Sequence, residues 1–367
     1  MNKILLTSVG SLVGYNVLDV LEGRRQDLQI IGTNSIETDS NVYRCDKAYY
    51  VPSTKNNNTD FVNRLLEIQS IEQPDLIIPC RDDDIGVLSR LRTHNPEFTN
   101  ICLCGSEKSV GMMLDKWLTF KFTSSHNLPF AASALPNPDS DNSEVNNLIK
   151  EYGFPLLAKP RDGYASLGVF IISNEKQLGE ALKKKNILIQ QYLSNPKVLE
   201  ELYIRFQNEG VPLFFSLEEE KHSIQTFVHR DGNIGEIFCT LHKMVSGRSL
   251  RVEKINNDTL KDIGLRYAKA MASEGWVGPL NIQCQLQQSG EYVAYELNGR
   301  FTGATSARYY LGFDEVGNTL NTLLGLHLQC NSSQRLKSKQ VSRYVTTNPI
   351  FDDDLTKFGN QGSWQSV

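Results

Sequence analysis

The stretch YELNGRFTGATSARYY, Tyr295 to Tyr310, places Glu296 and Asn298 two residues apart. Residues i and i+2 of a strand face the same way, so these two side chains should project together. Arg300 continues the same spacing, and Gly303 follows it. A carboxylate, an amide and a guanidinium on one face predict a site for a hard cation next to an anionic oxygen. The alternative is a solvated antiparallel face that carries these residues incidentally.

The segment around this stretch, residues 278–300, is typical of a β-hairpin that turns at Ser289 and Gly290. Gln283 lies on the partner strand, where side chains opposite one another approach within about 5 Å. Oxygen-bearing side chains that meet on one face suit Mg²⁺, which prefers oxygen ligands and commonly shares its sites with phosphates. The predicted metal ligands are therefore Gln283, Glu296 and Asn298.

A second set of polar residues lies upstream, in PLLAKPRDGYASLGVFIIS, residues 155–173. Lys159 ends an apolar run, and a lysine at the end of a buried strand is well placed to meet phosphate oxygens. The following loop, which contains Gly163 and Ser166, could close over phosphates with its backbone N–H groups. The alternative for Lys159 is a surface lysine that precedes a hairpin turn.

The run ILIQQYL, residues 187–193, predicts a strand that continues into an exposed linker. Such a linker can offer backbone groups and a glutamine carboxamide to the edge of an adenine ring. An ordinary strand end is the alternative. The residues in question are Gln190, Gln191, Tyr192 and Leu193.

Composition limits the class of protein. The chain has 367 residues, of which 40% are hydrophobic, and this length suits two or three packed domains. The net charge of −4 predicts neither a nucleic-acid partner nor a membrane surface. No apolar run reaches the roughly 18 residues that span a bilayer, and the first residues predict a strand, loop and helix rather than a signal peptide. Seven cysteines without metal spacing predict reduced thiols in a cytoplasmic protein.

The N-terminal part predicts a doubly wound α/β domain. Residues 3–9 and 28–34 are apolar, β-rich runs, and residues 11–23 between them show helical spacing, which predicts two parallel strands joined by a helix. Two further strands are expected at 74–83 and 100–106. Downstream, the sequence predicts a hairpin at 222–245 and a helix at 258–275, with no clear periodicity at 194–220 and a polar, weakly periodic tail at 331–367.

In chain order, KPRDG, QQYL and ELNGRFTG resemble the KP-x-x-G, Q-E-Y-[LI] and E-[IVL]-N-x-R-x-x-G motifs of the ATP-grasp family. The resemblance is nearest to carboxylate–amine ligases related to the carbamoyl-phosphate synthetase large subunit. It extends to LDKWLTFKF, which is similar to the family's "DK" helix, and it covers about residues 1 to 330. It implies a pre-ATP-grasp Rossmann-like domain, two ATP-grasp lobes and a C-terminal tail, at residues 1–105, 106–187, 188–330 and 331–367.

The resemblance also implies roles for individual residues. ATP and one or two Mg²⁺ ions, with Mn²⁺ as a substitute, are the expected cofactors. Arg300 and Lys243 are expected to act on the transferring phosphate, and Glu220 is expected to bind the ribose. The metal ligands would be the three named above. The other expected ATP contacts are Lys116, Lys159, Gly163, Ser166, Gln190, Gln191, Tyr192 and Leu193.

The implied reaction activates a carboxylate with ATP as an acyl phosphate, which an amine then attacks. Arg308 is expected to bind a substrate carboxylate. The expected partners are a small carboxylate and an amine, with an amino acid or its derivative as the default, and a homodimer is common in the family. Three features depart from its pattern: Tyr164 and Ala165 replace small loop residues, Gln283 stands where many members have a carboxylate, and about 25 extra residues follow the hinge.

Two alternatives belong to other classes. SVGSLVG, Ser8 to Gly14, could begin a Rossmann-type dinucleotide site, but its glycines are spaced G-x-x-x-G rather than G-x-G-x-x-G. A non-catalytic ATP-binding protein of the same fold is the other alternative. The completeness of the three motifs argues against it, because a decayed site should have lost some of these residues.

Overall fold

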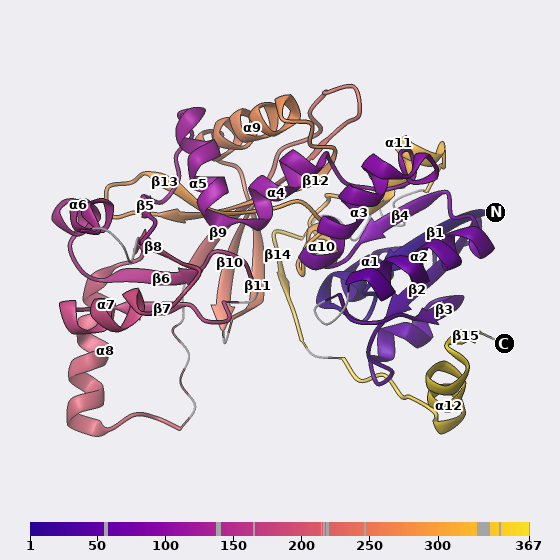
Figure 1. Ribbon diagram of the computed structural model, residues 1–367, viewed down its shortest axis with the longest axis horizontal. Coiled ribbons are helices and arrows are strands. Elements are labelled where there is room, and N and C mark those ends of the chain that lie inside the picture. Colours follow the sequence, from indigo (N-terminus) through magenta and orange to yellow (C-terminus); the bar gives the residue numbers. More distant parts are fainter. Residues whose placement is uncertain are drawn as a thin grey trace.

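The computed structural model describes residues 1–54, 58–136, 141–163, 166–213, 215, 217, 220–245, 247–328, 338–344 and 346–366. Within them the chain forms three sheets, of five, six and four strands. In Figure 1 the five-stranded sheet lies on the side of the N-terminus, the six-stranded sheet lies in the middle, and the four-stranded sheet lies on the far side.

The five-stranded sheet has the order β15-β3-β2-β1-β4, and all its strands are parallel except β15. This confirms the predicted doubly wound N-terminal domain. Residues 100–106 were expected to form a further strand, but they contribute only an isolated bridge between Ile77 and Cys102. The strands are β1 (Asn2–Thr7), β2 (Leu28–Asn34), β3 (Lys47–Tyr50), β4 (Leu76–Pro79) and β15 (Ser363–Gln365).

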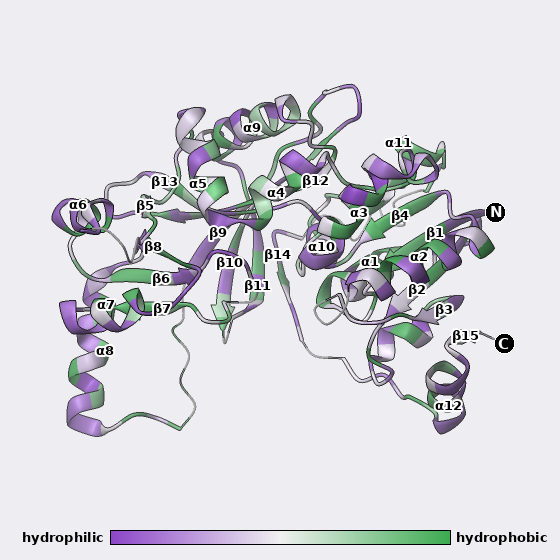
Figure 2. Ribbon diagram, viewed as in Figure 1, coloured by the Kyte–Doolittle hydropathy of each residue, from purple (hydrophilic) through white to green (hydrophobic). Residues whose placement is uncertain are grey.

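Helices connect these strands, and apolar side chains hold the layers together. Figure 2 shows hydrophobic colours concentrated on β1 and β4, whose Ile4, Leu5 and Ile77 are fully buried. Helix α1 begins after Ser11, whose hydroxyl accepts the N–H of Gly14. The helices here are α1 (Leu12–Leu21), α2 (Asn58–Glu72) and α3 (Asp82–His94), with short 3₁₀ helices at Ser40–Arg44 and Pro96–Phe98.

The four-stranded sheet is antiparallel, in the order β5-β8-β6-β7, and it packs against α6 and α7 around a core that includes Val145, Leu156 and Ile189. The strand–loop–strand prediction for residues 155–173 is therefore confirmed. The elements are β5 (Ser133–Ala134), β6 (Leu156–Pro160), β7 (Phe170–Ile172), β8 (Ile187–Gln191), α6 (Ser143–Tyr152) and α7 (Glu175–Leu182).

The six-stranded sheet has the order β13-β12-β9-β10-β11-β14, and both predicted hairpins belong to it. One face buries Ile224, Cys239 and Ile282 in the core that contains helix α9. The side chains that alternate with these point to the opposite, polar face. The strands are β9 (Glu220–Val228), β10 (Phe238–Val245), β11 (Arg248–Ile255), β12 (Gly278–Leu286), β13 (Tyr292–Asn298) and β14 (Gln340–Ser342).

The remaining helices are α4 (Glu107–Leu114), α5 (Lys116–Ser125), α8 (Pro196–Glu209), α9 (Asp258–Ser273), α10 (Thr305–Tyr310), α11 (Glu315–Leu324) and α12 (Asp352–Gln361). Helix α9 agrees with its prediction, whereas α8 forms in a segment where no helix was predicted. The polar tail is not a separate appendage, because β14 extends the six-stranded sheet and β15 extends the five-stranded one. Among the described residues, no helix has the length and apolar character needed to cross a membrane.

Candidate active site

The hairpin of β12 and β13 brings the predicted metal ligands together. Gln283 lies directly opposite Glu296, and the register of the two strands shifts between Gln283 and the next residue. Because Leu297 is buried in the core, its neighbours Glu296 and Asn298 point to the polar face of the sheet. Both residues line one cleft of about 140 Å³.

Other elements complete the walls of this cleft. Lys116 at the start of α5 and Gly163 in the phosphate loop line it, as do Asp82 and Asp83 at the start of α3. Lys116 reaches the loop directly, because its Nζ donates a hydrogen bond to the Gly163 carbonyl at 3.2 Å. Residues from all three parts of the fold therefore meet at one place. The sequence did not predict the two aspartates there.

Arg300 lies beside the metal-ligand pair, but it is already held by a carboxylate. Its Nε and Nη2 donate to the two Asp82 oxygens at 2.8 and 2.7 Å, and Nη2 also donates to Asn298 Oδ1 at 3.1 Å. Burial would lower the pKa of Arg300, but the charges of Asp82 and Glu296 raise it above its usual value. The guanidinium therefore stays charged and is fixed in orientation by helix α3.

Gln283 lies at the predicted position, but its side-chain oxygen already accepts two hydrogen bonds. Its Oε1 accepts hydrogen bonds from the Tyr295 hydroxyl at 3.1 Å and from Lys221 Nζ at 3.2 Å. A carboxamide oxygen has two lone pairs, so coordination of a metal by Gln283 would require one of these donors to move. Glu296 and Asn298 are therefore better placed as ligands than Gln283. Lys221 was not predicted from the sequence.

Lys159 is not a surface residue, since only 8% of it is exposed. Its Nζ donates to Gln190 Oε1 at 2.5 Å and lies 5.5 Å from the centre of the Tyr295 ring. Gln190 Nε2 in turn donates to Ser133 Oγ at 3.1 Å. Lys159, which is predicted to bind phosphate, is thus hydrogen-bonded within the four-stranded sheet to Gln190, the first residue of the predicted hinge.

The rest of the predicted hinge and loop can be placed as well. The N–H of Gln191 donates to the Ala132 carbonyl, and its side-chain Oε1 accepts the Ala132 N–H. Tyr192 and the buried Leu193 follow the end of β8. In the loop, Gly163 and Ser166 adopt positive φ angles of 116° and 56°. Tyr164 and Ala165, which depart from the family's pattern, lie outside the described residues.

Comparisons with known proteins agree on one architecture. The chain is 22% identical to a D-alanine–D-alanine ligase of Oceanobacillus iheyensis, over 89% of this chain and 93% of that protein. It superposes on the N5-carboxyaminoimidazole ribonucleotide synthetase of Thermotoga maritima with a TM-score of 0.61 and 19% identity, over 92% of this chain and 79% of that one. The N5-carboxyaminoimidazole synthetase of Staphylococcus aureus, complexed with ADP, gives a TM-score of 0.66 and 12% identity, over 89% of this chain and 78% of that one. The chain has the ATP-grasp fold. No family model matches it.

The predicted ATP-grasp architecture is thus confirmed, and the prediction of an ATP-dependent ligase agrees with the names of these relatives. The dinucleotide alternative is not favoured. The spacing of the first loop has a packing explanation instead. A Cβ added to Gly14 would lie 2.2 Å from the Val9 carbonyl oxygen, so only glycine lets α1 pack this closely.

Two predicted residues do not reach the ATP-grasp cleft. Lys243 and Glu220 are cross-strand partners on β10 and β9. Their neighbours His242 and Lys221 point to the polar face, so Lys243 and Glu220 point to the opposite face. Lys243 is exposed there, and so is Glu220. The assignment of Lys243 to the γ-phosphate and of Glu220 to the ribose is therefore corrected, because strand alternation turns both away from Glu296.

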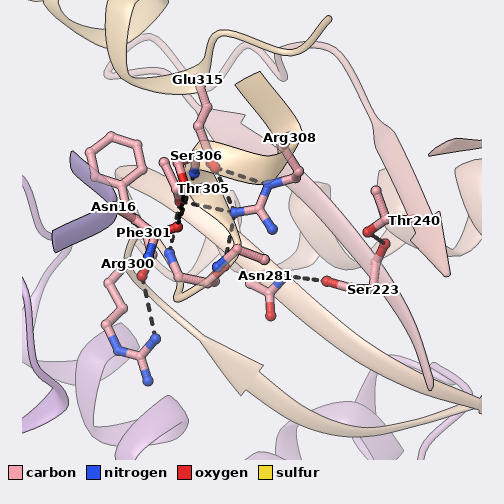
Figure 3. A network of polar contacts seen from close by, with 12 residues as sticks. Asn16, Ser223, Thr240, Asn281, Arg300, Phe301, Thr305, Ser306, Arg308 and Glu315 are labelled. Atoms are coloured by element: carbon pink, nitrogen blue, oxygen red, sulfur yellow. Dashed lines mark hydrogen bonds and ion pairs between the residues drawn. The ribbon is translucent and has the colours of Figure 1, made fainter. Parts of the chain in front are cut away.

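Arg308 is fully buried on α10 rather than open to the cleft. Its Nε and Nη2 donate to Glu315 Oε1 at 2.9 and 2.5 Å, and Nη2 also donates to the hydroxyls of Thr302 and Thr305. Figure 3 shows this cluster together with the strand residues of the polar face. Arg308 Nη1 finds no hydrogen-bond partner among the described residues, so one edge of the guanidinium is unsatisfied.

Proposed function

We propose that this chain is an ATP-dependent ligase that joins a small-molecule carboxylate to an amine, such as an amino acid or its derivative, through a C–N bond. The observation that carries the proposal is the cleft in which Glu296 and Asn298 meet Lys116 and Gly163. A carboxylate and an amide oxygen on one wall, with a lysine and a glycine loop on the other, suit a metal-bound nucleoside triphosphate.

The donor set fits a hard cation. Glu296 and Asn298 would hold one or two Mg²⁺ ions, with Mn²⁺ as a substitute, because both offer oxygen atoms from neighbouring positions of one strand face. When bound there, the metal would neutralise charge on the phosphates. Lys116 and Lys159 would meet other phosphate oxygens, and the hinge after Gln190 would receive the adenine.

The chemistry proceeds in two balanced steps. An oxygen of the substrate carboxylate attacks the γ-phosphorus of ATP, the bond to the β-phosphate oxygen breaks, and ADP leaves. The amine then attacks the acyl carbon and loses a proton, and inorganic phosphate leaves. Phosphoryl transfer depends on positioning and charge neutralisation more than on a protein nucleophile. Arg300 is the side chain we assign to the transferring phosphate, and Asp82 is the residue that positions it.

The compartment and the assembly belong to the same proposal. Six cysteines lie in the described residues, and all six are buried with free thiols. This agrees with the reducing conditions of the cytoplasm, where we place the enzyme. A homodimer is proposed on the resemblance alone.

The first test is a calorimetric titration with ATP, with and without Mg²⁺, with NADPH as the control ligand. Glu296→Gln removes one charge from the cleft, and Glu291→Gln on the same hairpin is the matched control, because Glu291 is exposed near the turn. Mg²⁺ should tighten ATP binding to the wild type and to Glu291→Gln but not to Glu296→Gln. Binding of NADPH without binding of ATP would refute the proposal.

A further inference from the structure

The phosphate loop is anchored to the start of helix α5 by two neighbouring residues of the chain. The N–H of Lys116 donates to the Arg161 carbonyl at 2.9 Å, and Lys116 Nζ donates to the Gly163 carbonyl at 3.2 Å. Arg161 also binds Asp115, because its Nε donates to Oδ1 at 3.3 Å and its Nη2 donates to Oδ2 at 2.5 Å. Backbone and side-chain hydrogen bonds therefore tie the loop to α5, although Asp115 and Arg161 are 46 residues apart in the sequence.

Asp115 serves both the helix and the loop with one carboxylate. It is the N-cap of α5, since its Oδ1 accepts the N–H groups of Trp117 and Leu118 at 2.8 and 3.2 Å. Its other oxygen binds Arg161, and the side chains of this pair are only 26% and 30% exposed. A partly buried, charge-assisted pair holds its geometry better than a fully exposed one. The pair therefore fixes the first residues of the phosphate loop relative to α5.

The same loop is anchored on its other side, next to β8. The N–H of Arg161 donates to the Asn186 carbonyl at 3.0 Å, and Asn186 Nδ2 donates to Asp162 Oδ1 at 2.7 Å. Asn186 directly precedes β8. Arg161 and Asp162 are the two variable residues of the KP-x-x-G motif, so the resemblance assigns them no role. In this chain they hold Gly163 at the wall of the cleft.

Lys116 keeps its charge available to a ligand because a neighbouring carboxylate is neutralised. In the described part of the chain, Lys116 Nζ has a neutral partner, the Gly163 carbonyl, and no ion pair. Asp115 precedes it in the sequence and would attract this ammonium group, but Arg161 already pairs with Asp115. A negative charge close to a positive one weakens the attraction that the positive charge exerts on an anion. Arg161 therefore preserves the positive charge that Lys116 offers to a phosphate.

The other charges of the cleft make this neutralisation important. Arg300 pairs with Asp82, and Arg81 pairs with Asp83. Asp162 accepts a hydrogen bond from a neutral amide only, and Glu296 is the proposed metal ligand. An unneutralised Asp115 would add to this negative charge and repel phosphate oxygens. The carboxylates that line the cleft are those of Asp82, Asp83, Asp162 and Glu296.

We propose that Arg161 is a positioning residue for the triphosphate of ATP. It fixes the phosphate loop on α5 and neutralises Asp115, so that Lys116 and the loop meet the same phosphate group. Arg161 acts through these neighbours rather than by touching the nucleotide, because its Nε and Nη2 already donate to Asp115. The inference rests on the proposed ligase function and adds a residue that the family motif leaves unspecified.

The test is a calorimetric titration of the full chain with ATP in the presence of Mg²⁺. Arg161→Met removes the pair and leaves Asp115 unneutralised, whereas Arg161→Lys keeps the positive charge. The double variant, Asp115→Asn with Arg161→Met, removes both charges, and α5 keeps its cap because asparagine is as good an N-cap as aspartate. Arg44→Met is the matched control, because Arg44 pairs with Asp19 at 2.9 Å, is 17% exposed and does not line the cleft.

We expect Arg161→Met to bind ATP about tenfold more weakly than the wild type, with Arg161→Lys between the two. The double variant should regain about threefold or more of that loss, because the repelling charge is gone. Arg44→Met should bind ATP like the wild type, and all melting temperatures should stay within about 4 °C of it, so that lost affinity is not lost folding.

Two results would overturn the inference. One is that Arg161→Met binds ATP as tightly as Arg44→Met. The other is that the double variant binds ATP no better than Arg161→Met. Failure of the wild type itself to bind ATP would instead refute the ligase function.

Discussion

Asp84 makes the stability of the N-terminal domain depend on pH in a direction opposite to that of most carboxylates. It is fully buried at the start of α3, where Thr7 Oγ1 and Ser8 Oγ donate to it at 2.8 and 3.1 Å. Burial raises its pKa from 3.8 to about 6, although both hydroxyls oppose the rise. The folded state therefore binds more protons than the unfolded state between about pH 4 and pH 6, and stability should fall as the pH rises through this window.

The size of the effect follows from the same numbers. A pKa that rises from 3.8 to about 6 on folding costs about 3 kcal/mol once the group is ionised, at 1.36 kcal/mol per pH unit. Asp84→Asn removes the ionisation and keeps the shape. Because pH 4 already lies slightly above the unfolded pKa of 3.8, part of this cost is present there, and we expect the free energy of unfolding of the variant, relative to wild type, to rise by roughly 2–2.5 kcal/mol between pH 4 and pH 7.

Urea denaturation at pH 4, 5, 6 and 7, followed by fluorescence, measures this difference. The free energy of unfolding of Asp84→Asn can change at every pH through altered hydrogen bonds. Only the lost ionisation changes how steeply that free energy depends on pH. Thr7→Val provides an independent check. Loss of the hydroxyl should raise the pKa of Asp84 in the folded state, so the fall in stability should continue to a higher pH in this variant than in the wild type. Parallel curves for wild type and Asp84→Asn would refute the reasoning.

Three further outcomes are expected. Asp82→Asn should lower the free energy of unfolding by about 2 kcal/mol, because Arg300 loses a charge-assisted pair. A double-mutant cycle with Arg300→Met, measured by urea denaturation, should give a coupling energy of similar size, and zero coupling would contradict the pairing. Gly14→Ala should lower the free energy of unfolding by about 1–3 kcal/mol through steric overlap. Gly111→Ala in α4, where an added Cβ meets open space, should raise it by roughly 0.5–1 kcal/mol. Equal melting temperatures of the two variants would contradict this. Lys159→Met should weaken ATP binding about tenfold or more in calorimetry, and unchanged affinity would remove this lysine from the nucleotide site.

The strands that carry the motifs could be predicted because their signals are local. Alternation fixes which side chains share a face, and the dipeptide at Ser289 and Gly290 fixes where the second hairpin turns. Helix α8 also has a local signal in the sequence. Asn195 caps it, Pro196 occupies its first turn, and Leu199 is its buried residue.

The sequence could not predict the contacts that complete the site. Asp82 and Arg300 are 218 residues apart, and no local pattern indicates that α3 will meet the end of β13. Lys243 was assigned to the site by its place near a motif, but one residue of strand register separates the polar face from its opposite. Pairing of β10 with β9 sets that register, and this pairing is a property of the folded sheet.

Strand β15 has a consequence for how the protein is made. It pairs antiparallel with β3 and covers the edge of the first sheet, yet it is more than 300 residues downstream of β3 in the sequence. At translation rates of 5–20 residues per second, β3 would leave the ribosome roughly 15–60 s before its partner. During that interval the nascent domain exposes an unpaired strand edge, the kind of surface that recruits other chains. A chaperone that shields this edge during synthesis would therefore increase the yield of correctly folded enzyme.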